Sequence, residues 1–232
     1  MRFTASGLLL LLASFSLQAN VILSEGFDNI ATLPGSGWAL VNNSAPLGTT
    51  EWFQGNTGVF DSQAGAEDAY IAANFNNAAF GGNISDWLIT PMLTLLDGDQ
   101  LSFYTRTEES SLFADSLEVR LSLNGASTNV GSTDSSVGDF TTLLLTINPT
   151  LNGSGYPQAW TQYTVTLSGL SGPATGRFAF RYDVPDTSVN ADYIGIDTVT
   201  VNAVPEPATG GFVAFMIAAA FLSHRLRRGR KI

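Results

Sequence analysis

The 232-residue sequence contains no cysteine, one histidine and one lysine. Without cysteine the chain forms no disulfide, offers no thiolate to a metal and has no thiol nucleophile. The histidine, His224, lies near the C-terminal end, so the rest of the chain has no imidazole for a serine triad. No Gly-x-Ser-x-Gly elbow and no Gly-Lys-Ser/Thr phosphate loop is present. These absences exclude several common enzyme classes, and the sequence predicts no catalytic residue.

Positive charge is scarce in the middle of the chain and concentrated at its end. Residues 20–203 hold four arginines and nineteen acids, which gives a formal charge of −15. Five of the ten basic residues lie in 225–231. A surface this negative repels phosphate backbones, so nucleic acid is not an expected partner. The same charge favours solubility after export and attracts cations.

The N-terminal segment, residues 1–19, has the organisation of a signal peptide. Arg2 supplies the positive charge, Leu8 to Leu12 form the apolar centre, and Leu17-Gln18-Ala19 offers a cleavage site. We therefore expect a helical signal peptide that signal peptidase removes. The mature part then begins at about Asn20, and its length suits one β domain.

The C-terminal segment, residues 204–232, combines three parts. Val204, Pro205, Glu206 and Pro207 come first, and the two prolines keep this motif out of helices and sheet ladders. An apolar segment at about 208–223 predicts a hydrophobic helix, shorter than the roughly 20 residues of an ordinary spanning helix. The basic residues of 225–231 favour the cytoplasmic side of a membrane.

This order of motif, short apolar segment and basic end resembles the PEP-CTERM sorting signal of Gram-negative exported proteins. The resemblance implies export, a transient inner-membrane anchor and cleavage near Pro207 by an exosortase. The mature protein is then expected at the cell surface or in the extracellular matrix. An ordinary C-terminal membrane anchor is the alternative, and the short apolar segment argues against it.

Strand periodicity dominates residues 20–203. Apolar and polar residues alternate in 101–106, 116–122, 162–168 and 177–182, which places one face of each segment in a core and the other in water. Turn-forming clusters such as Asp97-Gly98-Asp99 separate these segments. Many short antiparallel strands predict an all-β fold, a jelly-roll β-sandwich. The stretches 74–83 and 131–138 are rich in small and polar residues and predict surface loops.

A series of landmarks in residues 20–203 resembles two related families, the choice-of-anchor J domains and the cleaved-adhesin domains of gingipain proteases. The most specific landmarks are Glu25-Gly26-Phe27 followed by Gly37-Trp38, then Asp86-Trp87-Leu88-Ile89-Thr90-Pro91, and finally Ile194-Gly195-Ile196-Asp197. The resemblance implies a jelly-roll sandwich, an extracellular adhesin-like role and structural calcium. It implies no fixed catalytic set.

Four acids near the ends of the domain are the predicted calcium ligands: Glu25, Asp28, Asp192 and Asp197. The first and last strands of a jelly roll can lie side by side, which would bring these carboxylates together. Calcium takes 6–8 oxygen ligands, so such a group would suit it. The alternative is that Asp28 and Asp197 cap turns and Glu25 is solvated.

Tryptophan supplies the candidate ligand-binding residues. Exposed indole rings stack on the apolar faces of sugars. Trp38 and Trp87 have apolar neighbours and are expected in the core, whereas Trp52 and Trp160 have more polar surroundings and are the predicted binders.

Together these observations predict an exported, non-catalytic, adhesin-like or glycan-binding module whose partner is extracellular polysaccharide or a surface protein. Two alternatives remain. One is a secreted glycan-active hydrolase that uses paired carboxylates, held roughly 5–10 Å apart across a cleft. The other is a purely structural matrix protein without a ligand.

Overall fold

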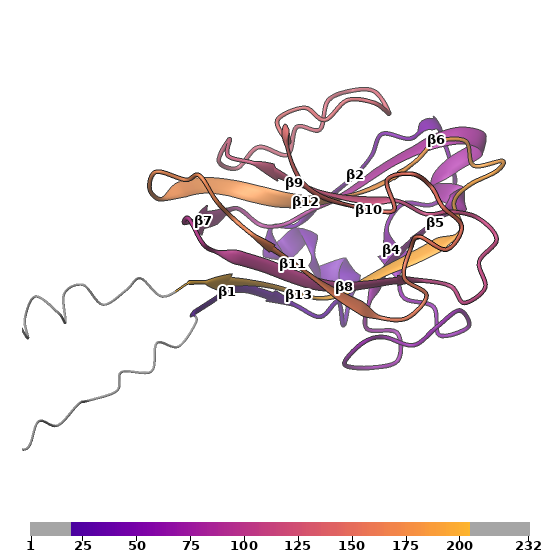
Figure 1. The fold of residues 1–232 in the computed structure, drawn as a ribbon, viewed down its shortest axis with the longest axis horizontal. Helices are drawn as coiled ribbons and strands as arrows, with labels where there is room; N and C mark the ends of the chain where they lie inside the picture. Colours follow the sequence, from indigo (N-terminus) through magenta and orange to yellow (C-terminus); the bar gives the residue numbers. More distant parts are fainter. Residues whose placement is uncertain (1–19, 205–232) are drawn as a thin grey trace, which may run out of the picture. The chain divides into compact units, whose positions relative to one another are not determined.

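The computed structural model describes residues 20–204, and within it Val21–Val204 form one compact unit. The predicted signal peptide, the hydrophobic helix and most of the sorting motif lie outside the described residues. Figure 1 shows two β-sheets that face each other, as the strand periodicity predicts. The prediction of an all-β, antiparallel sandwich is therefore confirmed.

Each sheet has a continuous order of antiparallel strands with one or two additional short strands. The six-stranded sheet has the order β11 (Thr161–Thr166), β8 (Gln100–Thr107), β13 (Tyr193–Ala203), β5 (Ile71–Asn74), β4 (Phe53–Gln54), and β1 (Asn20–Glu25) also pairs with β13. The seven-stranded sheet has the order β10 (Thr142–Ile147), β9 (Leu117–Ser122), β12 (Ala174–Val184), β6 (Ala78–Ile89), β2 (Ala39–Asn42), with β3 (Ala45–Leu47) on β6 and β7 (Leu93–Leu95) on β12.

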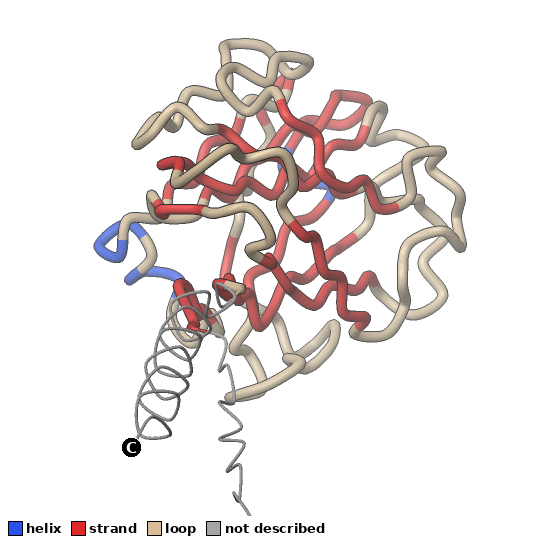
Figure 2. Tube along the Cα trace, turned by 60° about the vertical axis from the view of Figure 1, so that its left-hand side comes forward, coloured by secondary structure: helices blue, strands red, loops and turns tan. Residues whose placement is uncertain are grey.

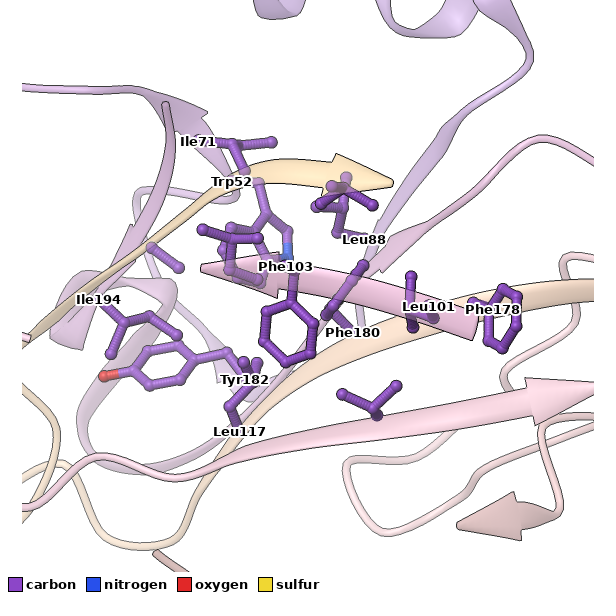
Figure 3. Packing of buried hydrophobic residues seen from close by; sticks show 14 of the residues in the cluster. Trp52, Ile71, Leu88, Leu101, Phe103, Leu117, Phe178, Phe180, Tyr182 and Ile194 are labelled. Atoms are coloured by element: carbon purple, nitrogen blue, oxygen red, sulfur yellow. The ribbon is translucent and has the colours of Figure 1, made fainter. Parts of the chain in front are cut away.

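The core lies between the sheets and is built from the apolar positions of the alternating segments. Phe103 of β8 and Phe180 of β12 meet edge to face across it, with ring centroids 4.9 Å apart. Figure 3 shows the surrounding residues, which include Leu101, Leu117 and Tyr182. Such alternation gives each strand one core face, and burial of these side chains is the main stabilising contribution to the fold.

The outer face of the seven-stranded sheet departs from the prediction of a solvated polar face. We call residues 123–141, between β9 and β10, the covering loop. Its Val130 and Phe140 pack on Trp87 of β6 and form a second small core outside the sandwich. In consequence Arg181 and Glu118, which alternation places on the water side, are only 5% and 9% exposed.

Helical structure in the described residues is limited to three short 3-10 turns: η1 (Ile30–Thr32), η2 (Pro34–Ser36) and η3 (Phe75–Asn77). No helix in residues 20–204 has the length and hydrophobicity needed to cross a membrane. Figure 2 shows the small share of helix beside the strands and loops.

The two predicted loops have different outcomes. Residues 131–138 form part of the covering loop, as predicted. The stretch 74–83 is not a loop, because it contains η3 and the first half of the long strand β6. Asn74 and Asn77 form a capping box around η3, so polar residues that suggest a loop here close a short helical turn. Asp97-Gly98-Asp99 is the predicted turn, and Gly98 has φ +91° there.

Candidate binding surfaces and the predicted calcium residues

Asp197, one of the predicted calcium ligands, is fully buried on β13 and joins two parts of the chain. Its Oδ2 accepts hydrogen bonds from the backbone N–H groups of Gln63 at 2.8 Å and Ala64 at 3.1 Å, and Oδ1 accepts from Thr198. Burial raises the pKa of Asp197, and the three N–H groups oppose that rise. The side chain therefore fixes the segment around residues 63–64 to the six-stranded sheet.

Asp28, three residues past the end of β1, approaches the same segment. A Cβ placed on Gly65 would lie 3.2 Å from Asp28 Oδ1, so Asp28 borders the segment that Asp197 holds. Asp28 is exposed, and its carboxylate makes no hydrogen bond within residues 20–204. Glu25 Oε1 accepts from the Phe27 N–H at 2.7 Å.

The backbone is unusual where these three segments meet. Phe27, Gly65 and Thr198 all have positive φ values, of 55°, 87° and 50°. Positive φ is costly for Phe and Thr, and such residues concentrate at functional sites and ligand clamps. Of the predicted calcium residues, Asp28 and Asp197 are the two that the fold brings to one junction, formed by 25–28, 63–65 and 197–198.

Asp192 is not part of that junction, which corrects the predicted group of four. It precedes β13, and five residues of extended strand separate it from Asp197 by about 16 Å. Its backbone N–H donates to Asp115, and its carbonyl accepts from Phe75. Residues 20–204 contain no group of three or more acidic, histidine or cysteine side chains placed to hold one metal ion. Calcium binding by this domain stays a prediction.

Trp52 lies in the core, in contrast with its predicted role as a binder. It is 2% exposed and packs in the main cluster between the sheets, so it cannot stack on a sugar. Trp38 and Trp87 are buried, as predicted. Trp52 lies in a bend directly before β4, so its polar neighbours in sequence do not show on which side of the chain its ring packs.

Trp160 is half-buried on the outer face of the six-stranded sheet. Its Nε1 donates to the Asp61 carbonyl at 2.8 Å, and its ring lies edge-on to Phe60 and Tyr70, with centroids 5.5 and 5.6 Å away. These contacts hold the segment between β4 and β5 against the sheet. Trp160 is therefore part of an aromatic cluster, and only an edge of that cluster is exposed to a ligand.

A groove lies on the other side of the molecule between β2, β3 and the covering loop; we call it the amide groove. It has a volume of about 360 Å³ and is lined by Asn42, Asn43, Ser44, Ala45, Leu47, Ser132, Thr133 and Asp134. Amide, hydroxyl and carboxylate groups stand beside the apolar Ala45 and Leu47, which is the mixture that sugar hydroxyls and sugar ring faces require. Asn43 Nδ2 donates to the Gly131 carbonyl at 3.0 Å and so ties the two walls together.

A second hollow lies within the segment between β4 and β5. It measures about 550 Å³ and is lined by Gly55, Asn56, Thr57, Ala66, Glu67 and Asp68. Two exposed carboxylates, Glu67 and Asp68, dominate it. In a domain of charge −15 this hollow suits a cation better than a neutral sugar.

Beneath the covering loop, a buried ionic network occupies the outer face of the seven-stranded sheet. Arg181 bridges Glu118 at 3.1 Å and Asp183 at 3.1 Å, and Arg120 pairs with Glu118 at 2.7 Å. Burial raises the pKa of Asp183 to about 6; burial also acts to raise the pKa of Glu118, but Arg120 and Arg181 lower it overall. Because Arg181 holds both acids, they form a structural network and are not presented to a substrate as the acid and base of a glycosidase.

Asp115 forms a second buried network at the other side of the same strands. It is fully buried, and burial raises its pKa to about 6. Tyr182 Oη donates to its Oδ1 at 2.5 Å, and the Asp192 N–H donates to the same oxygen at 2.9 Å. Oδ2 lies 2.6 Å from Thr107 Oγ1, which is also 2.9 Å from the Tyr193 carbonyl.

No protein-family model and no curated protein matches the sequence. Solved structures do match. The K1 cleaved adhesin domain of Lys-gingipain from Porphyromonas gingivalis W83 has 26% sequence identity and a TM-score of 0.53, over 78% of this chain and 98% of that domain.

The fold is that of a cleaved adhesin domain. The K3 domain of the same protein gives 23% identity and a TM-score of 0.54 over 81% of this chain and 100% of that domain. The K2 domain gives 19% identity and a TM-score of 0.51 over 77% of this chain and 98% of that domain. Both identities are below 25%, so these two comparisons show the fold alone. They confirm the adhesin-like architecture that the Glu25-Gly26-Phe27 and Ile194-Gly195-Ile196-Asp197 landmarks indicate.

Sequence reasoning missed the amide groove. Its two walls, 42–47 and 132–134, are far apart in the sequence, and each consists of small polar residues with no distinctive spacing. The only available signal was the excess of asparagine, serine and threonine in both stretches, and this composition also predicts ordinary turns.

Proposed function

We propose that this chain is an exported, non-catalytic adhesin-like module of the cell surface or extracellular matrix, and that it binds polysaccharide. One observation carries the proposal: the described domain matches the K1 cleaved adhesin domain over 98% of that domain's length, at 26% identity. The match supports a binding role outside the cell, and the acidic, cysteine-free domain suits that location.

The amide groove is the proposed polysaccharide site. It combines hydroxyl groups of Ser132 and Thr133 and the carboxylate of Asp134 with the apolar surface of Leu47. Neutral sugars need hydrogen-bond partners and an apolar contact, and a neutral ligand is not repelled by the charge of −15. Trp52 and Trp160 do not serve this site, because one is in the core and the other packs on the opposite sheet.

The test is a glycan array followed by calorimetry with extracellular polysaccharide of a Gram-negative host, using the chain recovered from an exporting host. Ser132→Tyr fills the groove with a bulky ring and should weaken binding at least tenfold. Ser135→Tyr is the matched control, since Ser135 is exposed on the same loop but does not line the groove. Equal loss in both variants, or no loss in either, would remove the groove from the proposal.

The same assay separates the two alternatives. Release of reducing ends from the bound polysaccharide would favour the glycan-active hydrolase. A chain that binds no member of the array and no matrix polysaccharide, although its melting curve shows a folded domain, would favour the purely structural matrix protein.

Export and C-terminal processing form the second part of the proposal. The support is the order of parts in the sequence, from the signal peptide to the Pro-Glu-Pro motif and basic end. The last strand ends at Ala203, and the Val204 N–H reaches Asp99 Oδ1 at 3.3 Å. The sorting motif thus begins where the sandwich ends, which suits processing by an exosortase without cutting the fold.

Calcium at the junction of 25–28, 63–65 and 197–198 is the third part. Asp28 would supply a carboxylate oxygen beside the segment that Asp197 holds, and backbone carbonyls of the junction would complete the oxygen set. A bound hard cation would offset the clustered negative charge and the strained backbone at Phe27 and Thr198.

A further inference from the structure

Large apolar side chains gather at the end of the sandwich that lies away from Asn20 and Val204. We call the set Phe75, Phe80, Leu112, Phe113 and Val189 the apolar tip. These are five of the eleven exposed large apolar residues of the described chain. Phe80 and Leu112 are 87% and 88% exposed, so their side chains stand almost wholly in water.

Hydrogen bonds show that the three segments carrying these residues lie together. Thr187 donates to the Gly82 carbonyl at 3.0 Å through its N–H and to the Ala79 carbonyl at 2.8 Å through its Oγ1. The Ala191 N–H donates to the Ala114 carbonyl at 2.9 Å. The β12–β13 loop therefore joins the start of β6, which bears Phe80, to the β8–β9 loop, which bears Leu112. Figure 1 shows these segments at the end opposite the described chain ends.

Isolated exposed apolar residues are ordinary, but a group at one end marks an interaction surface. None of the five residues lines the amide groove or the hollow between β4 and β5. Because Phe80 and Leu112 are almost wholly exposed, a partner must provide apolar pockets or a deformable apolar face to bury them.

The charges around the tip select among partners. Glu108 and Glu109 precede Leu112, and Asp186 precedes Val189; all three are exposed. The four arginines of the described domain are engaged elsewhere: Arg106 lies over the Phe60 ring, 4.4 Å from its centroid, Arg120 and Arg181 pair with Glu118, and Arg177 donates to backbone carbonyls. A second copy of this domain, whose residues 20–203 carry a charge of −15, and an anionic lipid surface would both be repelled.

We propose that the apolar tip is a docking surface for a protein partner whose binding face carries apolar side chains flanked by lysine or arginine. Apolar contact with Phe80 and Leu112 supplies affinity, and Glu108, Glu109 and Asp186 supply steering and selectivity. The tip and the amide groove share no residue, so this proposal does not rest on polysaccharide binding. A module with both would link a matrix polysaccharide to a basic protein.

The test uses the full chain recovered from an exporting host and three labelled model peptides of equal length: one of alternating lysine and leucine, one of lysine and serine, and one of glutamate and leucine. Fluorescence anisotropy should show saturable binding of the lysine–leucine peptide only. Phe80→Ser with Leu112→Ser should weaken it at least tenfold. The matched control is Met92→Ser with Leu143→Ser, which removes two half-exposed apolar residues elsewhere and should change nothing. Melting curves verify that both double variants are folded.

Three results would overturn the proposal. Equal binding of the lysine–leucine and lysine–serine peptides would mean attraction to the acidic surface alone. Unchanged binding by the Phe80→Ser/Leu112→Ser variant would mean that the contact lies elsewhere. Binding to phosphatidylcholine vesicles, or self-association by sedimentation, that this variant abolishes would assign the tip to lipid or to a second copy instead.

Discussion

The guanidinium of Arg181 lies over the indole ring of Trp87, 5.2 Å from its centroid, beneath the covering loop. Arg181 also bonds Ser85, Glu118 and Asp183, and it reaches the Asp134 carbonyl of the loop above it. One side chain thus joins two strands of the sheet to the loop that forms one wall of the amide groove. The shape of that groove depends on a buried cation.

Replacing Arg181 tests this dependence. Arg181→Met keeps an apolar side chain over Trp87 but removes the charge, and it should lower the free energy of unfolding by about 3 kcal/mol. This lies at the low end for breaking a buried ion pair, because Arg120 still pairs with Glu118. Chemical denaturation measures the loss. Adding Glu118→Gln should recover part of it, and a further loss in the double variant would contradict the network.

Asp115 should make stability depend on pH. Its pKa is about 6 in the folded state, above the usual value near 3.8, so the folded state binds the extra proton. The free energy of unfolding should therefore fall as the pH rises from about 4 to about 6, by on the order of 3 kcal/mol from this group, because a pKa difference of one corresponds to about 1.4 kcal/mol. Asp183, with a pKa of about 6, adds a smaller contribution of the same sign.

Asp115→Asn isolates that contribution. Thr107 has one hydroxyl proton but two acceptors in reach, Asp115 Oδ2 and the Tyr193 carbonyl. Protonated Asp115 resolves this by donating to Thr107, and an asparagine Nδ2 can donate in the same place. The variant should be nearly as stable as the parent at pH 4 and more stable at pH 7. Its free energy of unfolding should change less between these two pH values. Equal pH slopes for the two proteins would contradict the assignment.

Phe180 tests the core. It is fully buried between the sheets beside Phe103, so Phe180→Ala should cost about 3–5 kcal/mol of unfolding free energy. Urea denaturation measures the change. Leu143→Ala is the control on half-exposed β10, where the cost should stay below about 1 kcal/mol. A cost for Phe180→Ala as small as for Leu143→Ala would mean that the sheets do not pack here.

Calcium should raise the melting temperature if the junction of 25–28, 63–65 and 197–198 binds it. A ligand of the folded state adds about 2.7 kcal/mol at 100 times its dissociation constant. Asp28→Ala is the sharpest variant, because the Asp28 carboxylate makes no hydrogen bond within residues 20–204 and its loss should abolish the calcium shift while leaving the metal-free melting curve unchanged. Asp192→Ala, outside the junction, should keep the shift. Identical curves for metal-free parent protein with calcium and with chelator would exclude a stabilising site.

Processing should shorten the chain in its native host. Mass spectrometry of the surface or matrix form should show a C-terminus near Pro207, and replacing Glu206 by Ala should leave the uncut form in the membrane fraction. A mature surface protein that still ends at Ile232 would contradict the sorting proposal.

Periodicity was sufficient to predict the sandwich, because residues such as Phe178 and Phe180 can only be buried on one face of a strand. It could not predict burial on the other face. Whether Arg181 is exposed to solvent depends on the covering loop, whose Val130 and Phe140 pack on the sheet from positions distant in sequence. No local sequence pattern indicates such a long-range contact. Trp52 shows the same limit, since it lies in a bend before β4 and its polar neighbours in sequence say little about where its ring packs.

Among the predicted calcium residues, the approach of the first and last strands was predicted from the fold family, and the structure brings Asp28 and Asp197 to one segment. Asp192 was grouped with them because it also lies near the end of the domain, at the start of the last strand. In an extended strand, however, residues only a few positions apart in sequence lie far apart in space.

β13 is the last strand in the chain and also an inner strand of the six-stranded sheet, between β8 and β5. Its pairs run from Ile194 with Thr107 to Asn202 with Gln100 on one side, and from Tyr193 with Asn74 to Ile196 with Ile71 on the other. A chain that emerges N-terminus first holds β8 and β5 without the strand that joins them. In the proposed export, completion of the sheet would wait until residues 193–203 have left the translocation machinery. The domain would therefore stay incompletely folded, and able to cross a membrane as an extended chain, until its last strand emerges.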